Sequence, residues 1–166
     1  MTLLSWRKDY EVGVPQIDSE HHRLFELVNE FHGVYLRGDG GKEIPKVLNQ
    51  LVAYAQIHFQ HEEILMGEND YPHLDKQREQ HNDLITSIFK INEEFASDPS
   101  RASAETLQFV KHWLVDHILQ EDMNIGDFLR RKASQGAKVQ QNKTGEDASA
   151  AIPRDTVHNP GASDVG

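Results

Sequence analysis

The chain has 166 residues, and its 17 Lys and Arg against 27 Asp and Glu give a formal net charge of -10 with histidine neutral. An acidic surface of this kind repels phosphate backbones and anionic lipids. We therefore expect neither nucleic acid nor a membrane as a partner. The absence of cysteine excludes disulfides, thiolate metal sites and cysteine nucleophiles.

Four amphipathic helices are predicted after an irregular N-terminal arm over residues 1–18. The first helix begins at Asp18 or Ser19, either of which can cap it, and ends near Arg37 before a run of glycines. The other helices are predicted over residues of about 42–67, 72–96 and 103–131. Helices of this length with short connections pack as antiparallel neighbours, so the predicted fold class is all-α, an up-down-up-down four-helix bundle.

Residues 132–166 differ in composition from the predicted bundle. They contain no Leu and no aromatic residue, and they are rich in Ala, Gly, Ser, Gln, Asn and Asp. Such a segment buries too little apolar area to offset its ordering entropy, so we expect a disordered C-terminal tail. The predicted domains are therefore a bundle over residues 1–131 and a polar tail over residues 132–166, which we interpret as dispensable rather than as a tether.

The predicted inward faces of the four helices carry polar residues at one level of the bundle. Apolar residues recur at alternating steps of three and four, as in Leu24, Val28 and Phe31, which is typical of a core-facing stripe. Polar residues interrupt the stripes near the starts of the first and third helices and near the ends of the second and fourth. These positions are level in an antiparallel bundle, so seven polar residues converge on one part of the core: His21, His58, Glu62, Gln77, His81, His117 and Asp122.

This convergence indicates a metal site, because a buried imidazole or carboxylate without a partner is costly. Imidazole and carboxylate ligands suit iron, zinc, manganese or copper. His58 and Glu62 are four residues apart and share one helix face. His117 and Asp122 are five apart, about 140° around a regular helix, so spacing alone supports Asp122 less well.

Two further histidines compete for places in this site. His61 lies three residues after His58, so spacing leaves it open as a rival to Glu62. His22 lies off the apolar stripe that contains His21, so we expect it at the surface.

The chain resembles the hemerythrin family, in particular the single-domain bacteriohemerythrins, over about residues 5–130. The matching stretches in chain order are VGV at 12–14 with IDSEH at 17–21, HFQHEE at 58–63, YP at 71–72 with Gln77 and His81, and WLVDHI at 113–118 with Asp122. Their combined spacing is far more specific than a single His and Glu four residues apart.

The resemblance implies a centre of two iron ions with an oxo or hydroxo bridge, and dioxygen as its ligand. It also implies that Glu62 and Asp122 are the bridging carboxylates. The resemblance places His21 and His58 on the iron that keeps an open position, and His81 and His117 on the other iron. Trp113 and Leu114 match residues that form the wall of the ligand pocket. The resemblance thereby favours Glu62 over His61.

Position 77 departs from the family pattern, which places a third histidine of the second iron there. The amide oxygen of Gln77 is a weaker ligand than imidazole, so we expect Gln77 to be a weak metal ligand or none. His73 lies one turn away, about 6 Å along the helix axis, which makes it an unconvincing substitute. We therefore expect weaker iron retention, faster autoxidation or a second reactive position.

The function implied by the resemblance is that of a dioxygen carrier, store or local supplier, so we expect no enzymatic activity. One alternative is an oxygen or redox sensor, and another is a di-iron peroxidase or nitric-oxide-handling protein whose second iron is opened by Gln77. The partner in each case is dioxygen or another small oxidant. The chain has neither a secretory signal nor an apolar run of the roughly 20 residues that span a membrane, so we expect a cytoplasmic protein.

Overall fold

The structure is a computed structural model that describes residues 2–38, 40–98 and 104–149. Its helices are α1 (Pro15–Arg37), α2 (Gly40–Glu68), α3 (Leu74–Ser97), α4 (Ala104–His117) and α5 (Met123–Ser149), with a 3-10 turn over Lys8–Tyr10 and a π-helical turn over Ile118–Asp122 between α4 and α5. The chain divides into two compact units, Met1–Arg130 and Arg131–Gly166, and the first contains the bundle. The predicted all-α class is confirmed.

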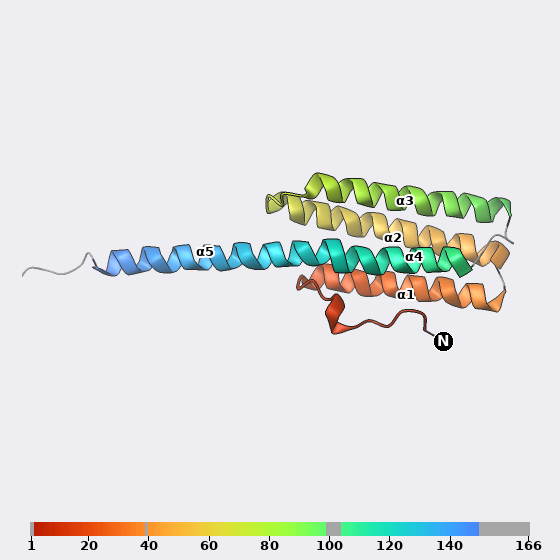
Figure 1. The fold of residues 1–166 in the computed structure, drawn as a ribbon, viewed down its shortest axis with the longest axis horizontal. Coiled ribbons are helices and arrows are strands. Elements are labelled where there is room, and N and C mark those ends of the chain that lie inside the picture. Colours follow the sequence, from red (N-terminus) through yellow and green to blue (C-terminus); the bar gives the residue numbers. More distant parts are fainter. Residues whose placement is uncertain (1, 39, 99–103, 150–166) are drawn as a thin grey trace, which may run out of the picture. The chain divides into compact units, whose positions relative to one another are not determined.

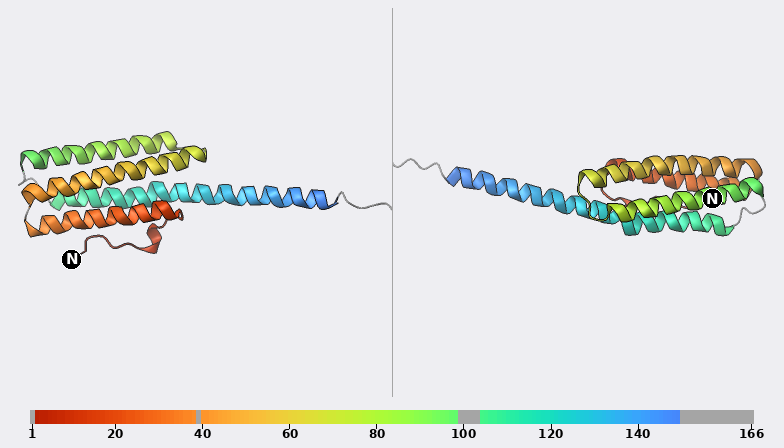
Figure 2. Two further views of the ribbon diagram at one scale, coloured as in Figure 1. Left: turned by 180° about the vertical axis from the view of Figure 1, so that it is seen from behind. Right: turned by 90° about the horizontal axis from the view of Figure 1, so that it is seen from above.

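The bundle is formed by α1 to α4 and the first residues of α5 (Figure 1). Helices α1 to α4 run alternately in opposite directions, α2 packs against both α1 and α3, and α4 packs against α1 (Figures 1 and 2). The predicted stripes face the core, where Leu24, Val28 and Phe31 are buried against Leu48 of α2 and Ile88 of α3. The up-down-up-down prediction is therefore confirmed.

The start of α1 differs from the prediction. The helix begins at Pro15, whose missing N–H is harmless in a first turn, and Val14 occupies the N-cap without a capping side chain. The side chain of Asp18 instead accepts hydrogen bonds from the backbone N–H groups of Val12 and Gly13, at 2.6 and 3.1 Å. Asp18 therefore ties the preceding arm to the helix rather than capping it.

The N-terminal arm is irregular, as predicted, and is held along the bundle at two points. Asn29 of α1 accepts hydrogen bonds from the backbone N–H groups of Leu3 and Leu4 and donates one to the carbonyl of Leu4. Further along, Arg130 donates to the carbonyl of Val12 at 2.6 Å, and that carbonyl lies so close to Gly126 that a Cβ there would collide with it.

The end of the last helix corrects the sequence analysis. Helix α5 continues to Ser149 instead of ending near residue 131, so the expected disorder does not hold for residues 132–149. Ala, Gln, Lys and Arg between residues 130 and 141 have good helix propensity, which explains why the helix continues over residues 131–138 although their side chains are exposed. Side chains 131–138 are all exposed, and residues 150–166 of the predicted tail lie outside the described residues.

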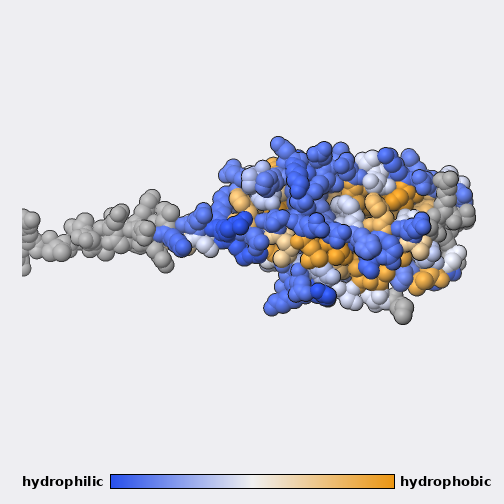
Figure 3. Space-filling model, viewed as in Figure 1, coloured by the Kyte–Doolittle hydropathy of each residue, from blue (hydrophilic) through white to orange (hydrophobic). Residues whose placement is uncertain are grey.

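The surface of the bundle is mixed. Hydrophilic side chains surround smaller hydrophobic patches on the face seen in Figure 3. Among the described helices, none combines the length and the apolar character that a membrane crossing requires.

Candidate metal centre

Four histidines, one from each helix of the bundle, meet at one level of the core. His21 lies early in α1, His58 late in α2, His81 early in α3 and His117 at the end of α4. Because neighbouring helices run in opposite directions, these positions coincide, as the sequence predicted. All four side chains are buried, with 0–7% of each residue exposed.

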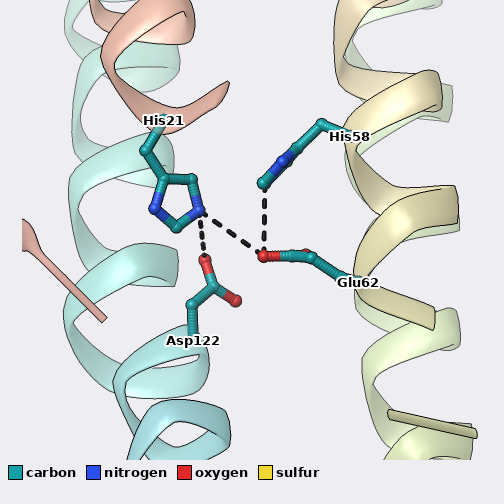
Figure 4. Close-up of side chains that lie close together, drawn as sticks. All are labelled: His21, His58, Glu62 and Asp122. Atoms are coloured by element: carbon teal, nitrogen blue, oxygen red, sulfur yellow. Dashed lines mark ion pairs between the residues drawn. The ribbon is translucent and has the colours of Figure 1, made fainter. Parts of the chain in front are cut away.

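Two buried carboxylates lie between the histidines. Glu62, one turn after His58, directs Oε1 toward the Nε2 atoms of His21 and His58, at 3.5 and 3.2 Å, and Oε2 toward Nε2 of His81, at 3.3 Å. Figure 4 shows His21, His58, Glu62 and Asp122, whose side chains point toward one another from α1, from α2, which carries both His58 and Glu62, and from the π-helical turn.

Asp122 is arranged in the same way as Glu62. Its Oδ2 lies 3.2 Å from Nε2 of His21, and its Oδ1 lies 3.2 Å from Nε2 of His117. Each carboxylate therefore turns one oxygen toward each pair of histidines. The six side chains form two potential metal sites, His21 with His58 and His81 with His117, which share Glu62 and Asp122.

The π-helical turn explains how Asp122 reaches this site. A regular helix would separate the directions of His117 and Asp122 by about 140°. The turn over Ile118–Asp122 replaces i+4 by i+5 periodicity, so residues five apart fall on the same face, and such turns are frequent at functional sites. The local change of helix type therefore brings Asp122 to the face of His117, which the spacing of a regular helix does not.

The electrostatics of the site are those of opposite charges buried together. Burial opposes a charged ring at His58, yet the carboxylates of Glu62 and Glu20 raise its pKa to about 10. Burial also opposes ionisation of Glu62, but the neighbouring positive His58 and the contacts from His21 hold the pKa of Glu62 well below its usual range. The carboxylates therefore remain ionised, which is the state that binds cations.

The donor set fits two metal cations. The four carboxylate oxygens of Glu62 and Asp122 face histidine nitrogens at 3.2–3.5 Å, but among the described residues none of these oxygens accepts a hydrogen bond, although both side chains are buried. Buried carboxylates without hydrogen bonds are costly unless a cation compensates them. Oxygen and imidazole nitrogen donors in this ratio suit iron in its first coordination shell.

Gln77 is also fully buried and lies one turn before His81 on α3. It is four residues from His81, as Glu62 is from His58, so its register places it at the level of the carboxylates. Neither amide atom has a hydrogen-bond partner among the described residues.

An apolar cavity of about 20 Å³ lies in the next layer of the core. Leu24, Ala55, Leu84 and Leu114 belong to this layer, each three residues from one of the four histidines. A cavity of roughly 10–15 Å³ holds one water molecule, so the space suits a very small molecule. The remaining lining residues are also apolar: Val28, Leu51, Phe59, Ile88, Val110 and Trp113.

Two aromatic rings separate this cavity from the second pair of histidines. Phe59 stacks on His81 with ring centroids 3.9 Å apart, and Trp113 stacks on His117 at 4.7 Å. On the opposite side, the arm residue Val12 and the α1 residue Ile17 line a smaller apolar void against the carboxylates. The centre is thus enclosed by apolar side chains on both sides.

The structure also places the histidines that spacing left open. The side chain of His61 is 39% exposed and that of His22 is 53% exposed, so Glu62 takes the inward position and His22 lies at the surface. Glu20 and Glu63 were not predicted as site residues, yet they contact the outer nitrogens of His58 and His81. Each is next to an inward residue, and helical spacing offers no signal for a side chain that reaches across to the next helix.

Comparisons with known proteins agree with this geometry. A family model described as the hemerythrin HHE cation binding domain matches residues 12–129, which include all six side chains of the two potential metal sites. A bacteriohemerythrin of Clostridium acetobutylicum is 30% identical over 124 residues, covering 72% of this chain and 96% of the relative. One from Methylococcus capsulatus is 28% identical over 130 residues, covering 78% and 98%. A crystal structure of a wild-type hemerythrin has a TM-score of 0.70 at 28% identity, covering 76% of this chain and 98% of its own.

Proposed function

The chain belongs to the hemerythrin family, whose members hold a di-iron centre and bind dioxygen, and from this premise we propose that it reversibly binds dioxygen as a carrier, store or local supplier. The observation that carries the proposal is the pair of buried carboxylates, each with one oxygen toward either pair of histidines. A single cation uses such an arrangement poorly, whereas two cations share it.

The proposed ligands follow from the contacts of the six side chains. His21 and His58 would hold one iron, and His81 and His117 would hold the other, since the Nε2 atoms of these rings face the inner carboxylates. Glu62 and Asp122 would hold both ions, because each turns one oxygen toward either pair of histidines. When bound, the two iron ions supply the coordination position and the electrons that dioxygen binding requires.

The surrounding residues make binding reversible by keeping water away. The cavity that begins at Leu24, Ala55 and Leu114 is lined only by apolar side chains, so it admits a small apolar molecule but offers water no hydrogen-bond partner. Phe59 and Trp113 hold the rings of His81 and His117 in place by stacking. Exclusion of water and protons from the site suppresses oxidative side reactions.

A second candidate function is supported by Gln77. The Gln77 side chain, which has no hydrogen-bond partner among the described residues, stands where the family pattern places a third histidine ligand of the second iron. An amide is a weaker donor than imidazole, so the iron held by His81 and His117 would have one weaker protein ligand. An iron with an exchangeable position favours reaction with peroxide or nitric oxide over stable storage of dioxygen. This candidate predicts turnover with peroxide or nitric oxide in the presence of a reductant.

The distinguishing experiment is anaerobic loading with ferrous iron followed by cycles of oxygen and argon. The carrier proposal predicts an optical band that appears with oxygen and disappears under argon over several cycles. Irreversible oxidation in the first cycle, with turnover of peroxide or nitric oxide, contradicts the carrier proposal and supports the second candidate. The Gln77→His variant, which restores an imidazole, is expected to oxidise more slowly than the wild type.

A further inference from the structure

Two of the four histidines are held from outside the centre by carboxylates of a neighbouring helix. Glu20 of α1 contacts Nδ1 of His58 on α2 through Oε2, at 2.9 Å. Glu63 of α2 contacts Nδ1 of His81 on α3 through Oε1, at 3.0 Å. In each case the opposite ring atom, Nε2, faces the carboxylate of Glu62 inside the centre.

These contacts determine which ring nitrogen is available to a metal. A histidine that donates its Nδ1 proton to a carboxylate keeps a lone pair on Nε2. The partner also fixes the ring orientation and increases its basicity, and loss of such partners typically weakens metal binding. By contrast, Nδ1 of His21 has no hydrogen-bond partner among the described residues.

The two outer carboxylates have different partners of their own. Oε1 of Glu20 accepts from Gln16 at 3.0 Å and contacts Nδ1 of His61 at 2.7 Å, and the Glu20 side chain is 12% exposed. Gln16 is uncharged, and among the described residues no Lys or Arg forms an ion pair with Glu20. The negative charge of Glu20 therefore acts on His58 without a fixed positive charge beside it.

Glu63 lies in a more open position beside a fixed positive charge. Arg78 donates from Nε to Oε2 of Glu63 at 3.3 Å, and the Glu63 side chain is 25% exposed. Both residues line a groove of about 950 Å³ between α2 and α3, and the buried side chains of His81 and Phe59 form part of its inner wall. The Arg78 charge and solvent both reduce the negative potential that Glu63 exerts on His81.

We propose that Glu20 and Glu63 are positioning residues of the di-metal centre that act unequally, with Glu20 making His58 the stronger donor and Arg78 moderating the effect of Glu63 on His81. The inference rests on the proposed function, because it assumes that His58 and His81 bind different ions. It assigns a role to two carboxylates that touch neither metal nor dioxygen. It also gives the chain a means of making its two ions electronically unequal besides the position of Gln77.

The test measures ferrous ion affinity under anaerobic conditions by competition with a chelator, for each of the two ions separately. Glu20→Gln and Glu63→Gln keep an acceptor for Nδ1 but remove the charge, whereas Glu20→Leu and Glu63→Leu remove both. His58→Ala and His81→Ala identify which ion is affected. Glu26→Gln serves as the matched control, because Glu26 is an exposed carboxylate of α1 paired with Arg23.

We expect each Leu variant to lower the affinity for one ferrous ion by about 10–100-fold, and each Gln variant to lower that affinity by less. The Glu20→Gln loss should exceed the Glu63→Gln loss, and Arg78→Gln should tighten the ion held by His81. Circular dichroism of the metal-free variants checks that they are folded, and the Glu26→Gln control should bind both ions as the wild type does.

Unchanged affinities in folded Glu20 and Glu63 variants would overturn the inference while leaving the proposed function intact. Equal weakening of both ions by either variant would also overturn it, since that result indicates a structural role. A wild-type protein that fails to bind two ferrous ions would instead remove the proposed function on which the inference rests.

Discussion

Gln77→Met should stabilise the metal-free protein, because Gln77 is fully buried and neither of its amide atoms has a hydrogen-bond partner among the described residues. A buried polar group left unsatisfied costs about 1–3 kcal/mol, and methionine has a similar length and volume without polar groups. The expected gain in the free energy of unfolding is therefore about 1–3 kcal/mol. At a urea dependence of roughly 1–3 kcal/mol per molar, the unfolding midpoint rises by about 1 M.

The assay is urea unfolding of the chelator-treated protein, monitored by circular dichroism. The same measurement is repeated after loading with ferrous iron. Gln50→Met is the control, because Gln50 is exposed on α2 and its replacement should change stability by less than about 0.5 kcal/mol. If the Gln77 amide binds one of the iron ions, the gain should shrink or reverse in the loaded protein. A metal-free Gln77→Met variant that is less stable than the wild type would refute this reasoning.

Three further predictions concern the cavity, the arm and the charges. Ala55→Val should reduce the small cavity and slow dioxygen association in stopped-flow measurements while two irons remain bound; an unchanged rate would contradict a role for the cavity. Gly126→Ala should destabilise the bundle by about 1–3 kcal/mol in urea unfolding, because its Cβ meets the Val12 carbonyl, whereas Gly136→Ala, which meets nothing, should stabilise its helix by up to about 1 kcal/mol. In the metal-free protein, the lowered pKa of Glu62 and the raised pKa of His58 both favour folding. The free energy of unfolding should therefore fall as pH drops below 4.5, the ordinary pKa of Glu, and also as pH rises from 6.5, the ordinary pKa of His, through about 10. Urea unfolding at a series of pH values measures this, and a flat profile would contradict the buried ion pair.

Periodicity predicted the bundle and most of its centre because both depend on regular helices. Alternating steps of three and four residues place His21, His58 and His81 on core-facing stripes, and antiparallel packing then makes their positions level. The same reasoning placed Gln77 in the core, where the structure finds it fully buried. These features need no knowledge of side-chain contacts between helices.

Departures from regular helix geometry were not predictable in this way. The π-helical turn that aligns Asp122 with His117 has no periodic signature, since spacing arguments assume about 100° per residue throughout. Asp is a residue type that often caps a helix, yet Pro15, three residues before Asp18, allows the helix to start sooner. Glu20 and Glu63 act across helices, where only the packed structure shows which rings they reach.

The central claim is that two iron ions are bound between Glu62 and Asp122. The most direct measurement is the number of ferrous ions bound per folded chain in an anaerobic titration of the wild type and of the Asp122→Leu variant. We expect the wild type to bind two ions and the variant to bind both more weakly, because Asp122 faces both histidine pairs. One ion or none in the folded wild type, or two tightly bound ions in the variant, would contradict this claim.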